Sequence, residues 1–188
     1  MNLEFLKPKE RLRVMDLVGS VGIDVTDWAN FKGGIERAAS NPKYCYEWSY
    51  EDRKKNLIVL NLWYDALLVE ENVIFQQLNL RETAEKTANG AQKRRAFNMD
   101  FSLQRAVRLD LDVRVIICNG RRKNESASKA EIRILDAETW YVESYNSDSG
   151  ECKLRRGQRP ATLIVTPKPP PWAVVIEPWG YCPQKCPC

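Results

Sequence analysis

Two short apolar runs bounded by polar residues constrain the fold of this chain most strongly. The first run is Leu57–Trp63, and the second is Asp112–Cys118, which Asn119 and Gly120 close. A nearly continuous apolar run of this length is typical of a strand that is buried on both faces, whereas core helices are longer. The first run therefore predicts a buried strand, and the second run predicts a further strand.

Aromatic residues alternate with other residues just before the first run. Their spacing predicts a strand from Tyr44 to Tyr50 with a row of aromatic side chains on one face, namely Tyr44, Tyr46, Trp48 and Tyr50. Polar residues 52–56 then predict a hairpin turn, so this strand should pair antiparallel with Leu57–Trp63. A second hairpin is predicted from Trp140–Tyr145 to Glu151–Leu154 around a polar turn.

Residues at helical spacing predict helices outside these strands. Residues 10–18 and 26–39 predict an N-terminal helical pair, and residues 81–109 predict a longer helical segment that is interrupted near Asn89. The candidate core contacts of the longer segment are Phe97, Phe101 and either Leu103 or Val107. We therefore expect an α+β fold, with a curved, mainly antiparallel sheet, the N-terminal helical pair and the one longer helical segment.

A change of composition near Arg159 divides the chain. With 188 residues, of which 44% are hydrophobic, the chain has the length and composition of one ordinary domain, which we predict over residues 1–159. Residues 160–188 are rich in proline and contain two tryptophans and three cysteines, which predicts an extended arm. Apolar residues 173–176 offer an edge strand that can dock on the domain itself or on another subunit.

Membrane and secretory signals are missing from the sequence pattern. No stretch approaches the roughly 20 apolar residues that span a bilayer, and residues 1–10 do not form a signal peptide. We therefore expect a cytoplasmic protein without a membrane partner, with reduced thiols at Cys45, Cys118 and Cys152.

The chain contains no histidine, the usual metal ligand and the usual proton carrier near neutral pH. Zinc proteases of the HExxH type, Ser-His or Cys-His nucleophiles and histidine-metal nucleases are therefore excluded. We predict no catalytic residue, no bound metal and no cofactor. The competing hypothesis is a magnesium-dependent nuclease built from carboxylates, with Asp110, Asp112, Glu131 and Glu47 as candidates, although no lysine follows these acids at the expected spacing.

Basic residues concentrate in the middle of the chain, although the formal net charge is only +4. The candidate phosphate contacts are Arg94, Arg95, Arg121, Arg122 and Lys123. Lysine and arginine side chains that contact phosphates supply the sequence-independent part of nucleic-acid binding. The alternative interpretation is an ordinary solvated surface, because short basic clusters are common in soluble domains.

Three tryptophans are candidates for the wall of a base-binding pocket: Trp28, Trp48 and Trp63. Exposed aromatic rings stack on bases, and an aromatic pocket with a few polar groups can hold an extruded base. The alternative is core packing, since alternate aromatics on a strand usually form the inward face of a sheet.

Six stretches of the chain carry a resemblance to a known family: Arg11–Val18, Gly22–Gly34, Asn41–Trp48, Asn61–Trp63, Val113–Ile116 and Gly150–Gly157. They resemble the N-terminal, non-catalytic region that precedes the catalytic domain in a group of bacterial HNH-family endonucleases. The resemblance covers about residues 8–160 and implies DNA targeting or the sensing of a modified base by association with a nuclease. The HNH catalytic motif itself is absent, because that motif requires histidine.

These features predict a module that binds nucleic acid or senses a modified base, with DNA as its expected partner and a separate nuclease subunit as a further candidate. The alternative is a protein-interaction module that forms homo-oligomers through residues 160–188. A histidine-free metal nuclease is a third and less favoured hypothesis.

Overall fold

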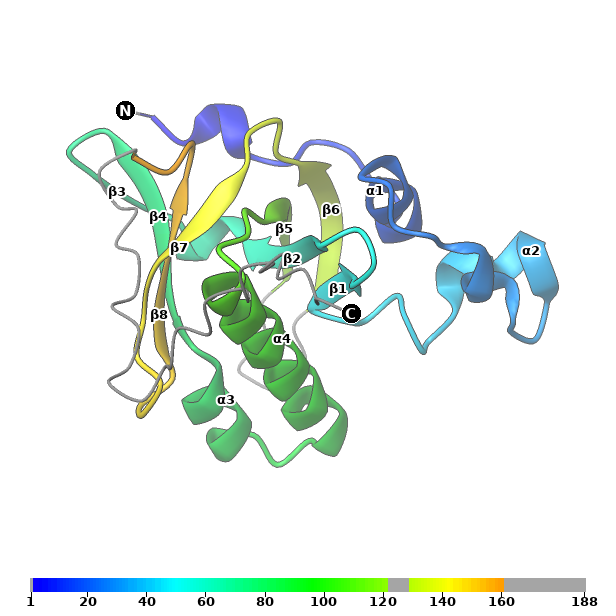
Figure 1. The fold of residues 1–188 in the computed structure, drawn as a ribbon. Helices are drawn as coiled ribbons and strands as arrows, with labels where there is room; N and C mark the ends of the chain where they lie inside the picture. The colour runs from blue at the N-terminus through cyan, green and yellow to red at the C-terminus, as the bar shows by residue number, and fades with distance from the viewer. Residues whose placement is uncertain (1, 122–128, 161–188) are drawn as a thin grey trace, which may run out of the picture. The chain divides into compact units, whose positions relative to one another are not determined.

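The first apolar run and most of the second form the central strands of a mixed sheet. The computed structural model describes residues 2–121 and 129–160. The four strands of this first sheet lie in the order β1-β2-β5-β6 and are β1 (Ser49–Asp52), β2 (Leu57–Trp63), β5 (Arg114–Arg121) and β6 (Lys129–Leu135). The pair β2 and β5 is parallel, whereas β1 and β6 pair antiparallel with their neighbours (Figure 1).

A second sheet contains the other four strands of the described residues. They lie in the order β3-β4-β8-β7, are all antiparallel, and are β3 (Leu68–Glu70), β4 (Val73–Asn79), β7 (Trp140–Tyr145) and β8 (Glu151–Arg156). A single backbone bridge between Val113 and Trp140 connects the start of β5 with β7. Among the described residues, this bridge is where the backbones of the two sheets meet.

Four α-helices and four short 3-10 helices connect or cover the strands in the described residues. The α-helices are α1 (Val14–Ser20), α2 (Gly34–Arg37), α3 (Leu80–Lys86) and α4 (Gly90–Arg108), and the short 3-10 helices are Glu4–Leu6, Thr26–Ala29, Ala38–Ser40 and Tyr64–Ala66. Asn89 caps α4, because its side chain accepts hydrogen bonds from the backbone N–H groups of Ala91 and Gln92 at 3.0 and 3.2 Å. This cap explains why the helical segment is interrupted where the sequence predicts it.

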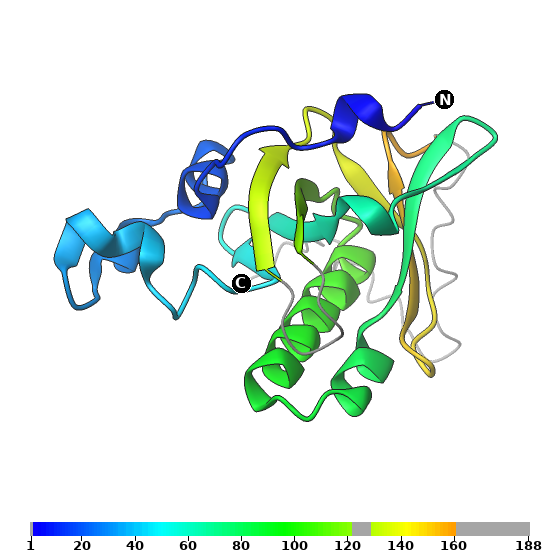
Figure 2. The same cartoon turned by 180° about the vertical axis from the view of Figure 1, so that it is seen from behind.

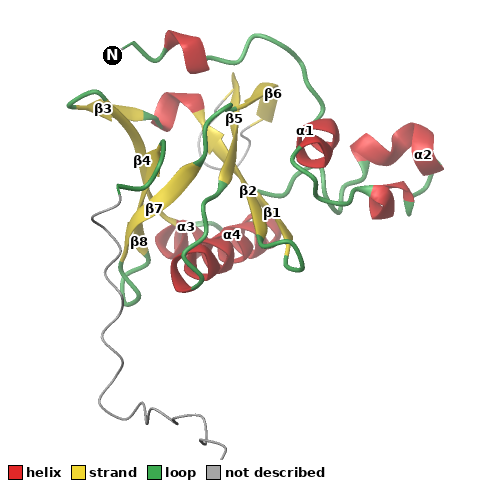
Figure 3. Cartoon of the chain, turned by 45° about the horizontal axis from the view of Figure 1, so that its top comes forward, coloured by secondary structure: helices red, strands yellow, loops and turns green. Residues whose placement is uncertain are grey.

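The sheet that contains β2 and β5 separates two hydrophobic cores. Ile58, Leu60 and Leu62 of β2 pack in the core that also receives α4 and the second sheet, while Val59 packs in a core with the N-terminal helices. Figure 2 shows the same division, with α1 and α2 on one side and the second sheet on the other. Helices α3 and α4 lie together along one side of the strands (Figure 3).

The predicted α+β class and its mainly antiparallel pairing are confirmed, as are both predicted hairpins. The strands divide into two separate four-stranded sheets, so the prediction of one curved sheet is wrong. The reason is long-range pairing: β4 joins β8, far along the chain, instead of extending the sheet of β2. Periodicity along the chain carries no information on such partners.

The prediction of an aromatic strand over Tyr44–Tyr50 is wrong. Residues 42–46 form turns and β1 begins only at Ser49. The buried Asn41 starts these turns, because its carbonyl oxygen accepts from the backbone N–H of Cys45 at 2.9 Å while its side chain donates to Trp28 at 2.9 Å. The four aromatic rings therefore do not share the face of a strand.

The predicted core contacts of α4 are only partly correct. Leu103 is fully buried, but the side chains of Phe97, Phe101 and Val107 are exposed, with 60% of Phe101 accessible. The buried face of α4 instead uses small residues and a methionine, since Ala96, Met99 and Ala106 join Leu103. Small side chains allow the helix to approach strands of both sheets closely.

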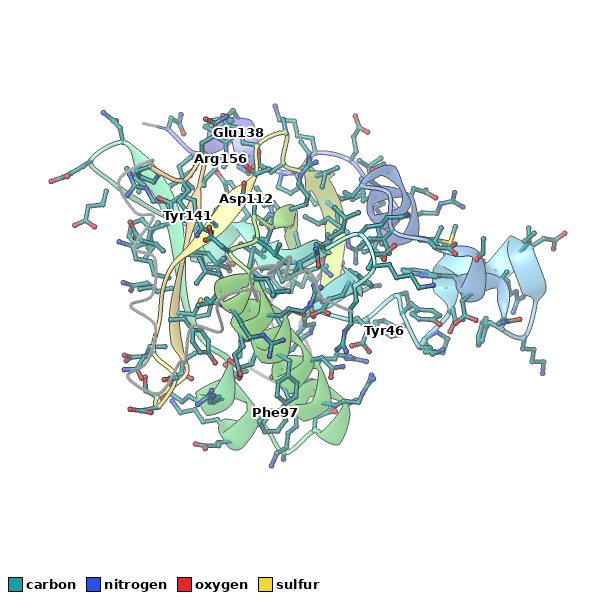
Figure 4. All side chains as sticks on the ribbon, in the orientation of Figure 1. Tyr46, Phe97, Asp112, Glu138, Tyr141 and Arg156 are labelled. Atoms are coloured by element: carbon teal, nitrogen blue, oxygen red, sulfur yellow. The ribbon has the colours of Figure 1, made fainter. Side chains whose placement is uncertain are left out.

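A buried ionic network closes the end of the second sheet. Asp136 is only 2% exposed and accepts hydrogen bonds from Trp140 Nε1 at 2.8 Å and from Arg156 Nε and Nη2 at 2.7 and 2.9 Å. Arg156 also pairs with Glu138 at 3.2 Å, and these two side chains lie next to each other in Figure 4. Asp136 thus joins the end of β6 to β7 and β8.

We predict that Asp136→Ala lowers the free energy of unfolding by about 3–5 kcal/mol, because it leaves the Arg156 guanidinium buried with a single exposed partner. Urea denaturation followed by circular dichroism measures the change. Asp148→Ala, which removes an exposed carboxylate, serves as the control and should shift stability by less than about 0.5 kcal/mol. A decrease below about 1 kcal/mol for Asp136→Ala would contradict this role.

Candidate functional site

A cavity of about 640 Å³ lies at the end of β2. Its lining comes from the segment before β1, from β2, β4, α3, the first half of α4, and from β5 and β6. The lining residues with the most distinctive chemistry are Glu47, Trp48, Asn61, Trp63, Gln76 and Arg95. Volumes of roughly 300–1,000 Å³ are typical of sites for small organic molecules.

Asn61 is the polar residue that β2 contributes to the lining of this cavity. Its Nδ2 donates to the backbone oxygen of Glu47 at 2.8 Å, which fixes the orientation of the amide because a carbonyl oxygen can only accept. The buried Oδ1 of Asn61 has no hydrogen-bond partner among the described residues. A buried acceptor without a partner costs about 1–3 kcal/mol. Protein atoms cover this oxygen, so a ligand in the cavity reaches it only if the side chain moves.

Gln76 contributes a second buried polar group from the other sheet. The residue is 7% exposed, lines the cavity, and its Oε1 has no hydrogen-bond partner among the described residues. The amide of a glutamine carries both a donor and an acceptor, so it can meet either kind of ligand group by rotating. Both sheets therefore contribute a polar residue to the lining of the cavity.

Arginine side chains surround a buried carboxylate at the same site. Glu47 is 8% exposed and forms a salt bridge with Arg94, while Arg95 Nε lies 3.9 Å from the same Glu47 oxygen. Arg95 Nε is buried without a hydrogen-bond partner among the described residues, and the Arg95 guanidinium lies 5.4 Å from the ring centre of the exposed Tyr46 (Figure 4 labels Tyr46). Arg95 thus lines the cavity, and a carboxylate and an aromatic ring hold its side chain in place.

Two thiols also line the cavity. Burial raises the pKa of Cys45, and burial raises the pKa of Cys118 to about 11, so both thiols are protonated near neutral pH. Cys152 lies away from the cavity, and burial raises its pKa to about 12. None of these three cysteines forms a disulfide.

The structure brings together two of the three predicted pocket tryptophans. Trp48 and Trp63 are half-buried and line the cavity. Trp28 does not join them, because it is 3% exposed in the second core and stacks on Tyr44 and Tyr50 with ring centres 5.1 and 5.9 Å apart. Stacking and burial of this kind serve packing rather than ligand contact.

The predicted phosphate contacts lie in two places. Arg94 is half-exposed beside the cavity, Arg95 lines it with 18% of its side chain accessible, and Arg121 is exposed and pairs with Glu131 at 3.6 Å. Arg122 and Lys123 lie outside the described residues. The arm of residues 160–188 also lies outside them, apart from Pro160.

The candidate carboxylates for a metal site do not gather. Asp110 and Asp112 flank the turn before β5, Glu131 lies on β6, and Glu47 is held by arginines. Among residues 2–121 and 129–160, no group of three or more His, Cys, Asp or Glu side chains is placed to hold a metal ion. No helix in these ranges is both long and apolar enough to cross a membrane.

Sequence reasoning missed Asn61 and Gln76. The available signal was a polar side chain within an apolar strand, since Asn61 interrupts the run of β2 and Gln76 interrupts β4. A polar residue at such a position is buried and needs a partner. No family model, no curated protein and no solved structure matches the chain.

We predict that thiol alkylation of the native protein modifies Cys45 at least about tenfold faster than Cys118 or Cys152, since reactivity follows access and thiolate fraction. The rates should rise with pH, because all three thiols have raised pKa values. Peptide mass spectrometry on a variant with the arm cysteines replaced by serine measures them. Unfolding in urea should equalise the three rates, and equal rates in the native protein would contradict the cavity's access to Cys45.

Proposed function

We propose that this protein binds nucleic acid and takes a single base into the cavity at the end of β2. The observation that carries the proposal is the lining of this cavity, where the half-buried Trp48 and Trp63 lie together with the polar residues Glu47, Gln76 and Arg95. The edge of a base carries donors and acceptors in one plane, so it can pair with polar side chains of this kind. Half-buried Trp48 and Trp63 add the aromatic surface on which a base stacks.

The charges around the cavity favour a polyanion. Lys86, Lys129 and Arg133 line it together with Arg95, and the half-exposed Arg94 lies beside it. Basic side chains next to a base pocket can neutralise the phosphates of the same strand, which gives binding a strong dependence on salt. An isolated neutral ligand would gain nothing from these charges.

The base must leave a duplex or come from a single strand to enter the cavity. Proteins that read an isolated base either bind single strands or extrude the base, at a cost of a few kcal/mol that is smallest at mismatched or damaged positions. The resemblance to the region that precedes HNH nuclease domains makes DNA the first nucleic acid to test, and a separate nuclease subunit is its proposed second partner.

We predict that Trp48→Leu and Trp63→Leu each weaken binding to single-stranded DNA by about 10- to 100-fold, because each removes a stacking surface worth about 1–3 kcal/mol. Fluorescence anisotropy with a labelled oligonucleotide measures affinity, and thermal melting checks the fold. Phe101→Leu is the matched control, since it removes an exposed aromatic ring on α4 that does not line the cavity. Unchanged affinity in both tryptophan variants would overturn the proposal.

We also predict that replacing Arg121, Arg122 and Lys123 together by alanine lowers the slope of log affinity against log salt by about 0.7–0.9 for each phosphate that these side chains neutralise. The weakening should be similar for all DNA sequences, because phosphate contacts carry no sequence information. Lys54→Ala, on the exposed turn between β1 and β2, is the control. An unchanged salt slope in the triple variant would show that these three residues do not contact phosphates and belong to the ordinary solvated surface.

A further inference from the structure

Helix α4 has a face of mixed character on the side opposite its buried residues. The residues of this α4 face are Lys93, Arg94, Phe97, Phe101, Arg105 and Arg108. Because an α-helix has about 3.6 residues per turn, they lie within about a third of its circumference. Phe97 and Phe101 are 36% and 60% exposed, and Figure 4 labels Phe97. Two rings four residues apart are neighbours on a helix, so they form one patch instead of two scattered apolar side chains.

The charges of the α4 face have one sign. The single acidic residue of α4, Asp100, is 3% exposed and therefore does not neutralise the face. Arg94 and Arg105 already bond groups of the domain. Lys93 and Arg108 are exposed and form no ion pair among the residues that the structure describes. These last two cations are therefore available to an anionic partner.

Cations lie at both ends of the α4 face, and the rings lie between them. Lys93 precedes Phe97, Arg108 follows Phe101, and the two cations are roughly 22 Å apart along the axis at a rise of about 1.5 Å per residue. An apolar centre within a charged rim is the arrangement of a protein–protein interface. A surface with evenly spaced anions, such as nucleic acid or lipid headgroups, is instead matched by cations along its whole length.

A second copy of this chain does not fit the α4 face. Since both ends of the face are cationic, a parallel pair and an antiparallel pair of α4 helices both place Arg or Lys side chains opposite one another. Like charges that face each other across an interface oppose association. The charges therefore favour a partner with acidic residues at two separated positions.

We propose that the α4 face binds an acidic amphipathic helix of another protein. Phe97 and Phe101 form a ridge that fits the groove between the side-chain rows of a second helix, and acids at the ends of that helix pair with Lys93 and Arg108. One exposed helix face provides a small interface, which is typical of transient complexes. None of the residues of the α4 face lines the cavity at the end of β2, so this proposal does not depend on the proposed function.

Three synthetic peptides test the charge pattern. Each has about 18 residues, which as a helix span the whole α4 face, and each has leucines at helical spacing. The end-acidic peptide has glutamates in its first and last turns, the middle-acidic peptide has the same composition with the glutamates beside the central leucines, and the end-basic peptide has lysine for each glutamate. Fluorescence anisotropy with the full chain measures affinity. We expect the end-acidic peptide to bind at least about tenfold more tightly than either of the others.

Phe101→Ser should weaken binding of the end-acidic peptide by at least about tenfold, because it removes the more exposed ring from the centre of the interface. Ile35→Ser is the matched control, since Ile35 is an apolar residue of α2 that is 84% exposed. Its affinity should equal that of the wild type. Thermal melting checks that both variants are folded.

Arg108→Glu should weaken binding of the end-acidic peptide by about threefold or more, because an ion pair is replaced by two like charges. Two further peptides carry lysines at one end and glutamates at the other. One of them should bind Arg108→Glu more tightly than it binds the wild type, and its sequence gives the orientation of the partner helix. Arg37→Glu makes the same change of charge on α2 and should leave all affinities unchanged.

Three outcomes would overturn the proposal. The first is equal affinity for the end-acidic and middle-acidic peptides, and the second is affinity that Phe101→Ser and Arg108→Glu both leave unchanged. The third is a wild-type protein that binds no peptide but binds single-stranded DNA or phosphatidylserine vesicles in a manner that Phe101→Ser abolishes, which assigns the α4 face to nucleic acid or to a membrane. Loss of DNA binding in Trp48→Leu alone reports on the cavity and leaves this proposal standing.

Discussion

Burial of the β2–β5 pair on both faces is the constraint on which the rest of the structure depends. Successive residues of β2 alternate between two cores, so that Leu60 packs with α4 and the second sheet while Val59 packs with the N-terminal helices. Residues Val59, Leu60 and Val115 are fully buried as a result. A pair of strands in this position needs a cover on each side, and the helices and the second sheet provide it.

Within this buried pair of strands, β2 contributes one polar residue to the lining of the cavity. Asn61 follows Val59 and Leu60 in β2, where an apolar side chain would be expected, and its register partner on β5 is the fully buried Ile116. β5 pairs with β2 from Val59 to Trp63, and on the other side the Asn61 N–H donates to the Trp48 oxygen at 2.8 Å, so the backbone fixes the position of Asn61. A site built on such strands keeps its geometry before a ligand arrives.

The spacing of residues along the chain predicts most of the helices and strands, but it predicts little of how the strands pair into sheets. The bounds of β2 and β7 follow from short apolar and alternating runs, and the cap at Asn89 marks the start of α4. The spacing of Tyr44–Tyr50 misled because turns started by Asn41 also carry aromatics, which here stack or lie exposed. The parallel pairing of β2 with β5 depends on contacts distant in sequence, which no local pattern encodes.

The candidate site was predictable in its residue types and not in its geometry. Trp48, Trp63 and Arg95 were selected as binding residues, but Glu47, the ionic partner of Arg95, was considered only as a metal ligand. A buried carboxylate is costly unless cations neutralise it, and here Arg94 and Arg95 of α4 do so from consecutive positions. Part of the basic cluster is therefore committed to holding an acceptor inside the cavity, and the remaining basic residues determine how strongly the protein attracts a polyanion.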